Sequence, residues 1–300
     1  MANQKPKKTT AKKSSNKPEN KKEVVATPAA KTDSVKPSSK GFFARKCDAN
    51  ENILTIFKSS KIWGALVGEL VGTMLVVMLL LTLGVQPLYL IFAIIGVYIA
   101  IVGISGANLN PLVTVGMMAT RRMSAIRGVL YILAQVLGAW IGLIIVNAFR
   151  LGSGTASELP MMAEISGDVF WTVALVELLG AIVIAFCYAR GLRFARKSPV
   201  TFAVAVTSGM TLAIIFGIVI TQSFFGLMDS FIFNPAAALM YQILPTTAEN
   251  FGELAGLAGL ALLAYVLVPM IGGVIGFFIS DIATKLSAGG YSCDDYDCEE

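Results

Sequence analysis

Six long apolar runs constrain this chain more than any other feature of its sequence. Each run is about 20 residues or longer, enough for a helix to cross a hydrocarbon core of ~30 Å. The composition agrees, because 55% of the residues are hydrophobic and 14% are charged, whereas soluble domains are about a quarter charged. We therefore predict an all-α membrane protein with six transmembrane helices, at about 62–84, 88–106, 126–149, 169–189, 200–222 and 254–282.

The net charge of +5 comes from one end of the chain. Of the 24 Lys and Arg residues, 13 lie in residues 1–46, while residues 47–300 carry 11 basic and 16 acidic side chains. A nearly uncharged body argues against a nucleic-acid partner, and the lack of histidine excludes catalysis that depends on it. We expect no enzyme activity and no cofactor.

The charges of the connectors predict the orientation. Basic residues gather in the connectors 120–127 and 190–197, while 150–168 and 223–233 are poor in them. Because basic loops stay on the cytoplasmic side, an even number of spans places both termini in the cytoplasm. We therefore expect a multi-pass protein of the cell membrane.

Two apolar segments, 110–120 and 234–244, are about half as long as a span requires. Each begins with Asn-Pro, in which Asn suits a helix N-cap and Pro the first helical position. One follows the second span and the other the fifth, so the chain divides into two halves of three spans each. An odd number of spans inverts the second half relative to the first. The pattern predicts two re-entrant half-helices that meet at a midplane site flanked by Asn110 and Asn234.

This inverted repeat defines the expected organisation of the chain. The terminal segments are a disordered basic cytoplasmic tail and an acidic cytoplasmic tail. A juxtamembrane segment and an extracellular connector complete the division. Glycines in the spans are expected to permit close helix packing: Gly72, Gly106, Gly138, Gly142, Gly180, Gly272 and Gly276. The boundaries are 1–41 (basic tail), 42–61 (juxtamembrane), 62–149 (first repeat), 150–168 (connector), 169–283 (second repeat) and 284–300 (acidic tail). We expect no metal site in the acidic tail, whose two cysteines lack a second pair or a histidine.

Several motifs resemble the major intrinsic protein family of aquaporins and glycerol facilitators. They are SGANLNPLVTVG at 105–116, FNPAAALM at 233–240, GELVGT with Glu69, VELLGA with Glu177, and the segments that carry Gln135 and Pro269. The resemblance covers about residues 62–283 and implies a homotetramer in the membrane lipid with one pore per subunit. Asn110 and Asn234 would line that pore and donate hydrogen bonds to water or hydroxyl oxygens.

The chain departs from the family pattern at positions that the resemblance places in the pore. Asn108 replaces the usual His, Leu112 replaces Ala, and Ala237 replaces the Arg that narrows the outer filter. Ala238 stands where glycerol facilitators carry Asp, while Phe231 matches their aromatic residue. Candidate filter partners are Leu90 or Phe92 on the second span and Thr221 or Gln222 on the fifth.

Glu69 and Glu177 are the ionisable residues deep within the spans, where a carboxylate is normally paired or functional. One interpretation is a proton relay. The resemblance favours a structural role instead, in which these residues support the half-helices together with Gln135, Pro111 and Pro235.

These observations favour a passive channel for small uncharged solutes, namely glycerol, similar polyols and water. Two alternatives remain at this point: a proton-coupled carrier that uses Glu69 and Glu177, and a non-conducting membrane scaffold that binds partners through its tails.

Overall fold

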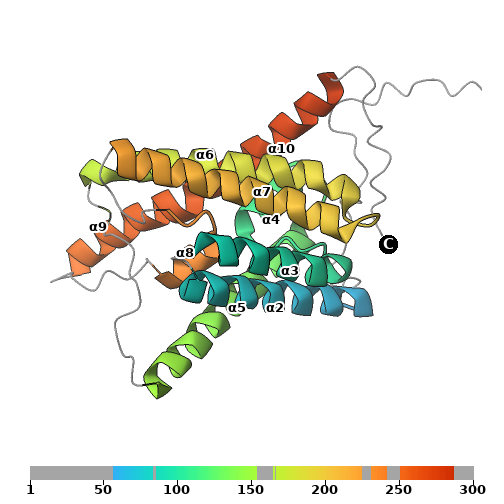
Figure 1. The fold of residues 1–300 in the computed structure, drawn as a ribbon, viewed down its shortest axis with the longest axis horizontal. Helices are drawn as coiled ribbons and strands as arrows, with labels where there is room; N and C mark the ends of the chain where they lie inside the picture. Colours follow the sequence, from blue (N-terminus) through green and yellow to red (C-terminus); the bar gives the residue numbers. More distant parts are fainter. Residues whose placement is uncertain are drawn as a thin grey trace, which may run out of the picture. The chain divides into compact units, whose positions relative to one another are not determined.

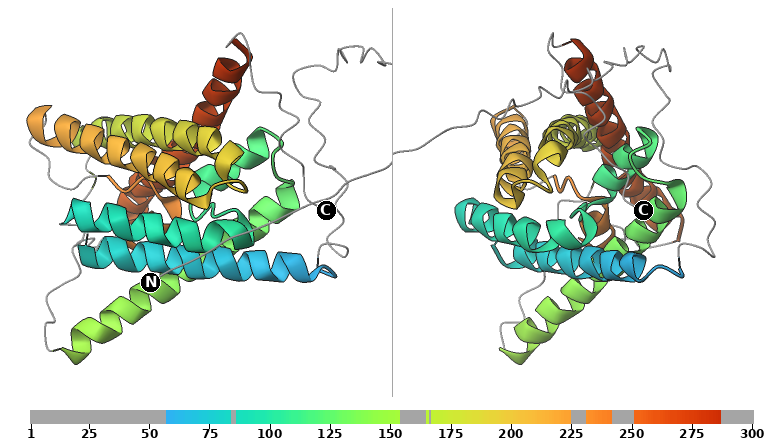
Figure 2. Two further views of the ribbon diagram at one scale, coloured as in Figure 1. Left: turned by 45° about the vertical axis from the view of Figure 1, so that its right-hand side comes forward. Right: turned by 90° about the vertical axis from the view of Figure 1, so that its right-hand side faces the viewer.

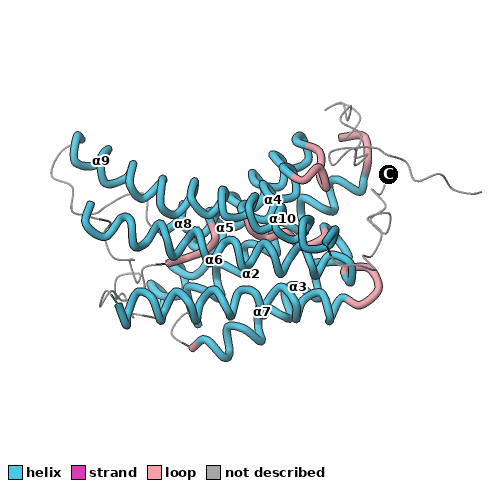
Figure 3. Tube along the Cα trace, turned by 90° about the horizontal axis from the view of Figure 1, so that it is seen from above, coloured by secondary structure: helices cyan, strands magenta, loops and turns pink. Residues whose placement is uncertain are grey.

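The computed structural model describes residues 57–83, 86–153, 165, 167–224, 231–241 and 251–286. The basic tail 1–41 lies outside these residues. Most of the juxtamembrane segment, of the connector 150–168 and of the acidic tail also lies outside them. Within the described residues every regular element is a helix (Figure 1, Figure 3).

Six helices are long and apolar enough to cross a membrane, which confirms the predicted number of spans. In chain order, five of the spans are built on α2 (Ser60–Leu83), α3 (Pro87–Ser105), α5 (Ala125–Gly152), α6 (Gly167–Gly191) and α7 (Pro199–Ile218). A π-helical turn, η2 (Val219–Phe224), extends α7, and a short 3-10 helix, η1 (Leu192–Phe194), follows α6. The sixth span consists of α9 (Phe251–Leu262), the π-helical turn η3 (Leu263–Leu267) and α10 (Val268–Leu286).

The two predicted half-helices are present as α4 (Pro111–Ala119) and α8 (Pro235–Tyr241). Each begins at the proline of an Asn-Pro pair, and the asparagine is the N-cap. The side-chain oxygen of Asn110 accepts a hydrogen bond from the Leu112 amide at 3.0 Å, and that of Asn234 accepts one from the Ala236 amide at 3.0 Å. These caps satisfy amides at the helix start that have no intrahelical acceptor.

The inverted repeat is visible in the way the helices pack. In the first repeat α5 crosses α2, and in the second α10 crosses α6; both α5 and α10 run obliquely across the other long helices (Figure 2). Glycines make these crossings close. A methyl group on Gly138 of α5 would lie 2.2 Å from the Leu70 carbonyl oxygen, and one on Gly272 of α10 would lie 2.7 Å from that of Leu178.

One of the glycines expected to serve packing has a different role. Gly106 has no neighbour that would touch an added methyl group, so the packing prediction was wrong at this position. Its φ of 87° is left-handed, and it ends α3 while its amide donates to the Val102 carbonyl oxygen. A residue with a side chain would be strained in that conformation.

Gly138→Ala is expected to lower thermal stability, by about 1–3 kcal/mol, because the new methyl group meets backbone that cannot move aside. Gly64→Ala is the matched control on α2, since nothing lies within 4 Å of its added methyl group. Thermal unfolding of the purified variants in detergent measures the difference. Equal melting temperatures for the two variants would contradict the close crossing of α2 and α5.

Candidate functional site

The two Asn-Pro pairs meet in the interior of the protein. The Asn110 amide nitrogen Nδ2 donates to the Phe233 carbonyl oxygen at 2.8 Å, and Nδ2 of Asn234 donates to that of Leu109 at 3.3 Å. Each asparagine thus binds the residue that precedes the other. Both are nearly inaccessible, 1% and 3% exposed. Because an amide has two N–H groups, each asparagine carries a further donor beyond the bond across the pair.

The residue before each asparagine adopts an unusual backbone conformation. Leu109 and Phe233 have φ of 52° and 54°, in the left-handed region that bulky residues avoid. Their side chains pack against equivalent glycines: a methyl group on Gly72 would lie 2.3 Å from the Leu109 side chain, and one on Gly180 would lie 2.2 Å from the Phe233 ring. The two repeats therefore form the same turn and accommodate it in the same way.

Glu69 lies beside the first of these turns and accepts four hydrogen bonds. Its oxygen Oε1 accepts from the Ser105 hydroxyl at 2.6 Å and from the Asn108 amide at 3.0 Å. Oε2 accepts from the Leu109 amide at 2.8 Å and from Nε2 of Gln135 at 2.7 Å. The carboxylate thus joins α2, the turn before α4, and α5.

Glu177 occupies the equivalent place in the second repeat. Its oxygen Oε1 accepts from the Ile232 amide at 2.5 Å, and Oε2 accepts from the Phe233 amide at 3.1 Å. Both carboxylates are fully buried. Among the described residues, the hydrogen bonds given for Glu177 come from backbone amides.

A side-chain network surrounds the first asparagine, and sequence reasoning found only part of it. Thr114 accepts from Gln135 Nε2 at 3.0 Å and from Asn108 Nδ2 at 3.2 Å. The Tyr188 hydroxyl lies 2.8 Å from the Gly106 carbonyl oxygen and 2.9 Å from Asn108 Oδ1. Thr114 was missed although it follows Asn110 by one helical turn. Tyr188 was missed because it is 80 residues from Asn108 in the sequence, and nothing in its apolar span indicates that contact.

At the other end of the site, Phe231 stacks on Phe233 with ring centroids 5.0 Å apart. Its ring also lies against Gly217 of α7, where an added methyl group would come within 2.7 Å. Sequence reasoning missed Gly217 and named Thr221 or Gln222 for this span. Thr221 is buried and donates to the Gly217 carbonyl oxygen at 2.8 Å, whereas Gln222 is exposed.

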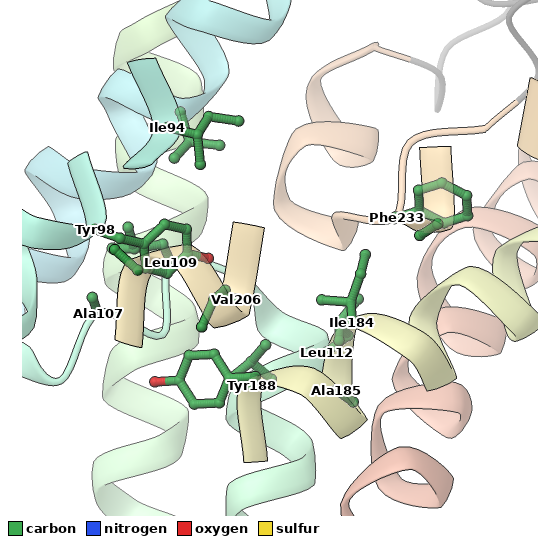
Figure 4. Packing of buried hydrophobic residues seen from close by; sticks show 14 of the residues in the cluster. Ile94, Tyr98, Ala107, Leu109, Leu112, Ile184, Ala185, Tyr188, Val206 and Phe233 are labelled. Atoms are coloured by element: carbon green, nitrogen blue, oxygen red, sulfur yellow. The ribbon is translucent and has the colours of Figure 1, made fainter. Parts of the chain in front are cut away.

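The two candidate filter residues on α3, Leu90 and Phe92, also differ in burial. Leu90 is 3% exposed and belongs to the largest buried cluster, whereas Phe92 is 66% exposed on the outer surface of the helix. The structure therefore brings Leu90, but not Phe92, into the interior. Tyr188, Phe233 and Leu109 belong to the same cluster as Leu90, and Figure 4 shows them with neighbouring members.

Three positions that depart from the expected motifs are fully buried: Leu112, Ala237 and Ala238. Ala237 packs in a cluster with residues from α2 and α5, among them Val77 and Ala139. Ala238 packs instead with a cluster that includes Tyr265 of the sixth span.

A sequence profile described as "Major intrinsic protein" matches residues 56–282, which include every element of this site. The chain belongs to the major intrinsic protein family. The resemblance carried by its Asn-Pro motifs is therefore confirmed, and the aquaporin-like fold agrees with it.

Named relatives of this major intrinsic protein are similar over part of their length. Aquaporin AqpM of Methanothermobacter marburgensis is 31% identical over 123 residues, which cover 41% of this chain and 49% of the relative. Aquaporin PIP2-5 of Oryza sativa is 28% identical over 198 residues, 63% of each chain. The chain thus spans about half to two thirds of the length of these relatives. Among solved structures, the aquaglyceroporin from Plasmodium falciparum matches with a TM-score of 0.48 and 17% identity, covering 75% of this chain and 96% of that one.

Proposed function

We propose that this protein is a passive channel for water and small uncharged solutes such as glycerol. The observation that carries the proposal is the pair of asparagines, each of which caps a half-helix and donates across to the other repeat. A helix start has a partial positive charge, so the two ends oppose the passage of cations and protons. The further amide donors provide hydrogen bonds to a solute that has lost its hydration.

The outer filter in this proposal consists of Leu90, Gly217, Phe231 and Ala237. Its side chains are apolar or absent, and Ala237 removes the fixed charge and the bulk that an arginine would supply there. Such a filter favours a polyol, whose carbon chain can lie along Phe231, over strict selection for water.

The contacts of Glu69 and Glu177 favour bracing over a proton relay. A relay needs partners that exchange protons. Most donors to the two carboxylates are amide N–H groups, which keep their protons, and among the bonds given for the described residues the Ser105 hydroxyl is the one donor that exchanges readily. Held in this way, the two glutamates support the half-helices together with Gln135, Pro111 and Pro235. A proton-coupled carrier is therefore the weaker candidate.

We also propose that the protein lies in the cell membrane as a homotetramer, with both termini cytoplasmic. The exposed large side chains of its long helices support a lipid or subunit environment, among them Trp63, Trp140 and Leu133. Arg122 and Asp281 form an ion pair at 2.6 Å on the side of the basic connectors, which is the expected cytoplasmic side.

Proteoliposomes that contain the purified protein are expected to take up glycerol and water faster than empty vesicles, as measured by stopped-flow light scattering. Urea serves as a third neutral solute, and a pH-sensitive dye inside the vesicles tests for proton movement. Uptake should be independent of a pH gradient. Permeability equal to that of empty vesicles for all three would contradict the channel, and uptake driven by a pH gradient would favour the carrier.

A further inference from the structure

Four buried aromatic rings meet on the α4 side of the paired asparagines. Tyr98 comes from α3, Tyr188 from α6, Phe202 from α7 and Phe277 from α10, and all four are fully buried. The Phe202 ring centroid lies 6.1 Å from that of Tyr98 and 5.3 Å from that of Tyr188. Tyr188 in turn lies 6.1 Å from Phe277. The rings therefore link spans of both repeats.

This aromatic cluster lies at the opposite end of the site from the outer filter. Leu90, Ile94 and Tyr98 are spaced by four residues and belong to one buried cluster, so they follow one another along the inner face of α3. Tyr98 is about 12 Å further along the helix than Leu90. On α7, Phe202 and Gly217 are separated by about 22 Å. The asparagine pair is connected to both: Phe233, whose carbonyl oxygen accepts from Asn110, stacks on Phe231, and the Tyr188 hydroxyl lies within hydrogen-bond distance of Asn108.

Tyr188 connects this cluster to the turn before α4. Its hydroxyl lies within hydrogen-bond distance of the Gly106 carbonyl oxygen and of Asn108 Oδ1. One hydroxyl has one proton, so it donates to one of these oxygens at a time; a 180° rotation of the Asn108 amide would let that residue donate instead. The turn is irregular backbone at membrane depth, which is tolerated where it is buried or lines a pathway. These contacts of the hydroxyl therefore fix the Tyr188 ring beside the turn.

Tyr98 carries a hydroxyl that has no hydrogen-bond partner among the described residues, although it is fully buried. Figure 4 shows this hydroxyl directed away from α3, on the side of Val206 of α7. Buried hydroxyl groups are normally paired in native proteins, with ordered water where no protein group is available. The interior between α3 and α7 thus offers a donor and acceptor to a small polar molecule.

We propose that Tyr98, Tyr188 and Phe202 form an inner constriction on the permeation pathway, where the Tyr98 hydroxyl hydrogen bonds to passing water or to a hydroxyl group of a polyol. This inference rests on the proposed channel function. It assigns the upper size limit of the permeating solute to these three residues. The outer filter lacks the bulk of an arginine, so the inner rings decide how large a solute can pass. The Tyr98 hydroxyl replaces part of the hydration that the solute loses between the asparagines and the cytoplasmic side.

The test compares water, glycerol, erythritol and ribitol in proteoliposomes of the full chain. Tyr98→Ala and Tyr188→Ala are expected to raise ribitol permeability relative to water about tenfold, because a lowered steric barrier admits the larger solute. Tyr98→Phe keeps the ring, so the size limit should stay while glycerol permeability falls about threefold with the lost hydrogen bond. Tyr89→Ala is the matched control, since Tyr89 lies on the same helix but is 64% exposed.

The outcomes separate this inference from the function on which it rests. If the wild-type protein passes none of the solutes, the proposed channel function fails. If the wild type conducts and both alanine variants keep its ribitol-to-water ratio, only the inner constriction is overturned. Should the alanine variants not elute as folded protein in gel filtration, Tyr98→Phe decides: a glycerol permeability equal to that of the wild type overturns the inference.

Discussion

Glu69→Ala is expected to leave little or no folded protein. The substitution removes the acceptor for four donors at once: the Ser105 hydroxyl, the Asn108 and Leu109 amides, and Gln135 Nε2. A buried donor left without a partner costs about 1–3 kcal/mol, so four cost roughly 4–12 kcal/mol. That range approaches the whole stability of a typical domain, about 5–15 kcal/mol. The left-handed turn at Leu109 would also lose the bonds that hold it.

Glu177 provides the matched comparison for this prediction. The same substitution there removes the acceptor for the Ile232 and Phe233 amides, so Glu177→Ala should destabilise about half as much as Glu69→Ala. Glu69→Gln keeps one acceptor oxygen and should fall between the alanine variant and the wild type. Thermal unfolding in detergent, followed by size-exclusion chromatography, measures all three. A Glu69→Ala protein as stable as the wild type would show that the carboxylate is not a brace.

The number of spans and the half-helices could be predicted because they depend on length and local chemistry. A run of about 20 apolar residues has few alternatives to a spanning helix, and Asn-Pro begins a helix through the cap that Asn110 and Asn234 make. The repetition of these signals in two halves then predicted the inversion. The equivalent glycines, Gly138 and Gly272, confirm it at the level of packing.

The faces of the helices could not be predicted in the same way. The sequence of α3, PLYLIFAIIGVYIAIVGIS, is apolar all round, so no polar stripe distinguishes the inward Leu90 from the outward Phe92. On the fifth span the sequence suggested Thr221 or Gln222, and the structure adds Gly217, which lies against the Phe231 ring. The π-helical turn Val219–Phe224 follows α7 and changes the helical register, and Gly217, which makes the contact, has no side chain to suggest a role.

The network around Asn108 also required the structure. Tyr188 is 80 residues from Asn108, and Glu69 is 66 residues from Gln135. A contact between residues so far apart in the sequence depends on which helices are neighbours and on how each is rotated. The family resemblance suggested that Glu69 and Gln135 act together, but it gave no reason to join Tyr188 or Thr114 to them.

Ala237→Arg is expected to lower glycerol permeability at least tenfold and to lower water permeability less. Ala237 is fully buried beside Val77 and Ala139, so the larger side chain has to extend toward the pathway, where its guanidinium can remain hydrated. An arginine buried in the apolar cluster instead would cost about 3 kcal/mol or more. An arginine side chain that extends into the pathway narrows the outer filter beside Phe231. It therefore obstructs a polyol more than a single water molecule. Stopped-flow light scattering on proteoliposomes measures both permeabilities for one preparation.

Two further variants separate charge, bulk and misfolding in this experiment. Ala237→Leu adds bulk without charge. If it lowers glycerol permeability less than Ala237→Arg does, the difference is due to the guanidinium charge. Ala125→Arg makes the same substitution at an exposed position at the start of α5, next to the basic connector, and should leave both permeabilities at the wild-type level. An equal loss of water and glycerol permeability in Ala237→Arg would contradict a position on the pathway. The arginine would then have disturbed the packing of α8 against α2 and α5, and the selectivity of the outer filter would depend on Leu90, Gly217 and Phe231 alone.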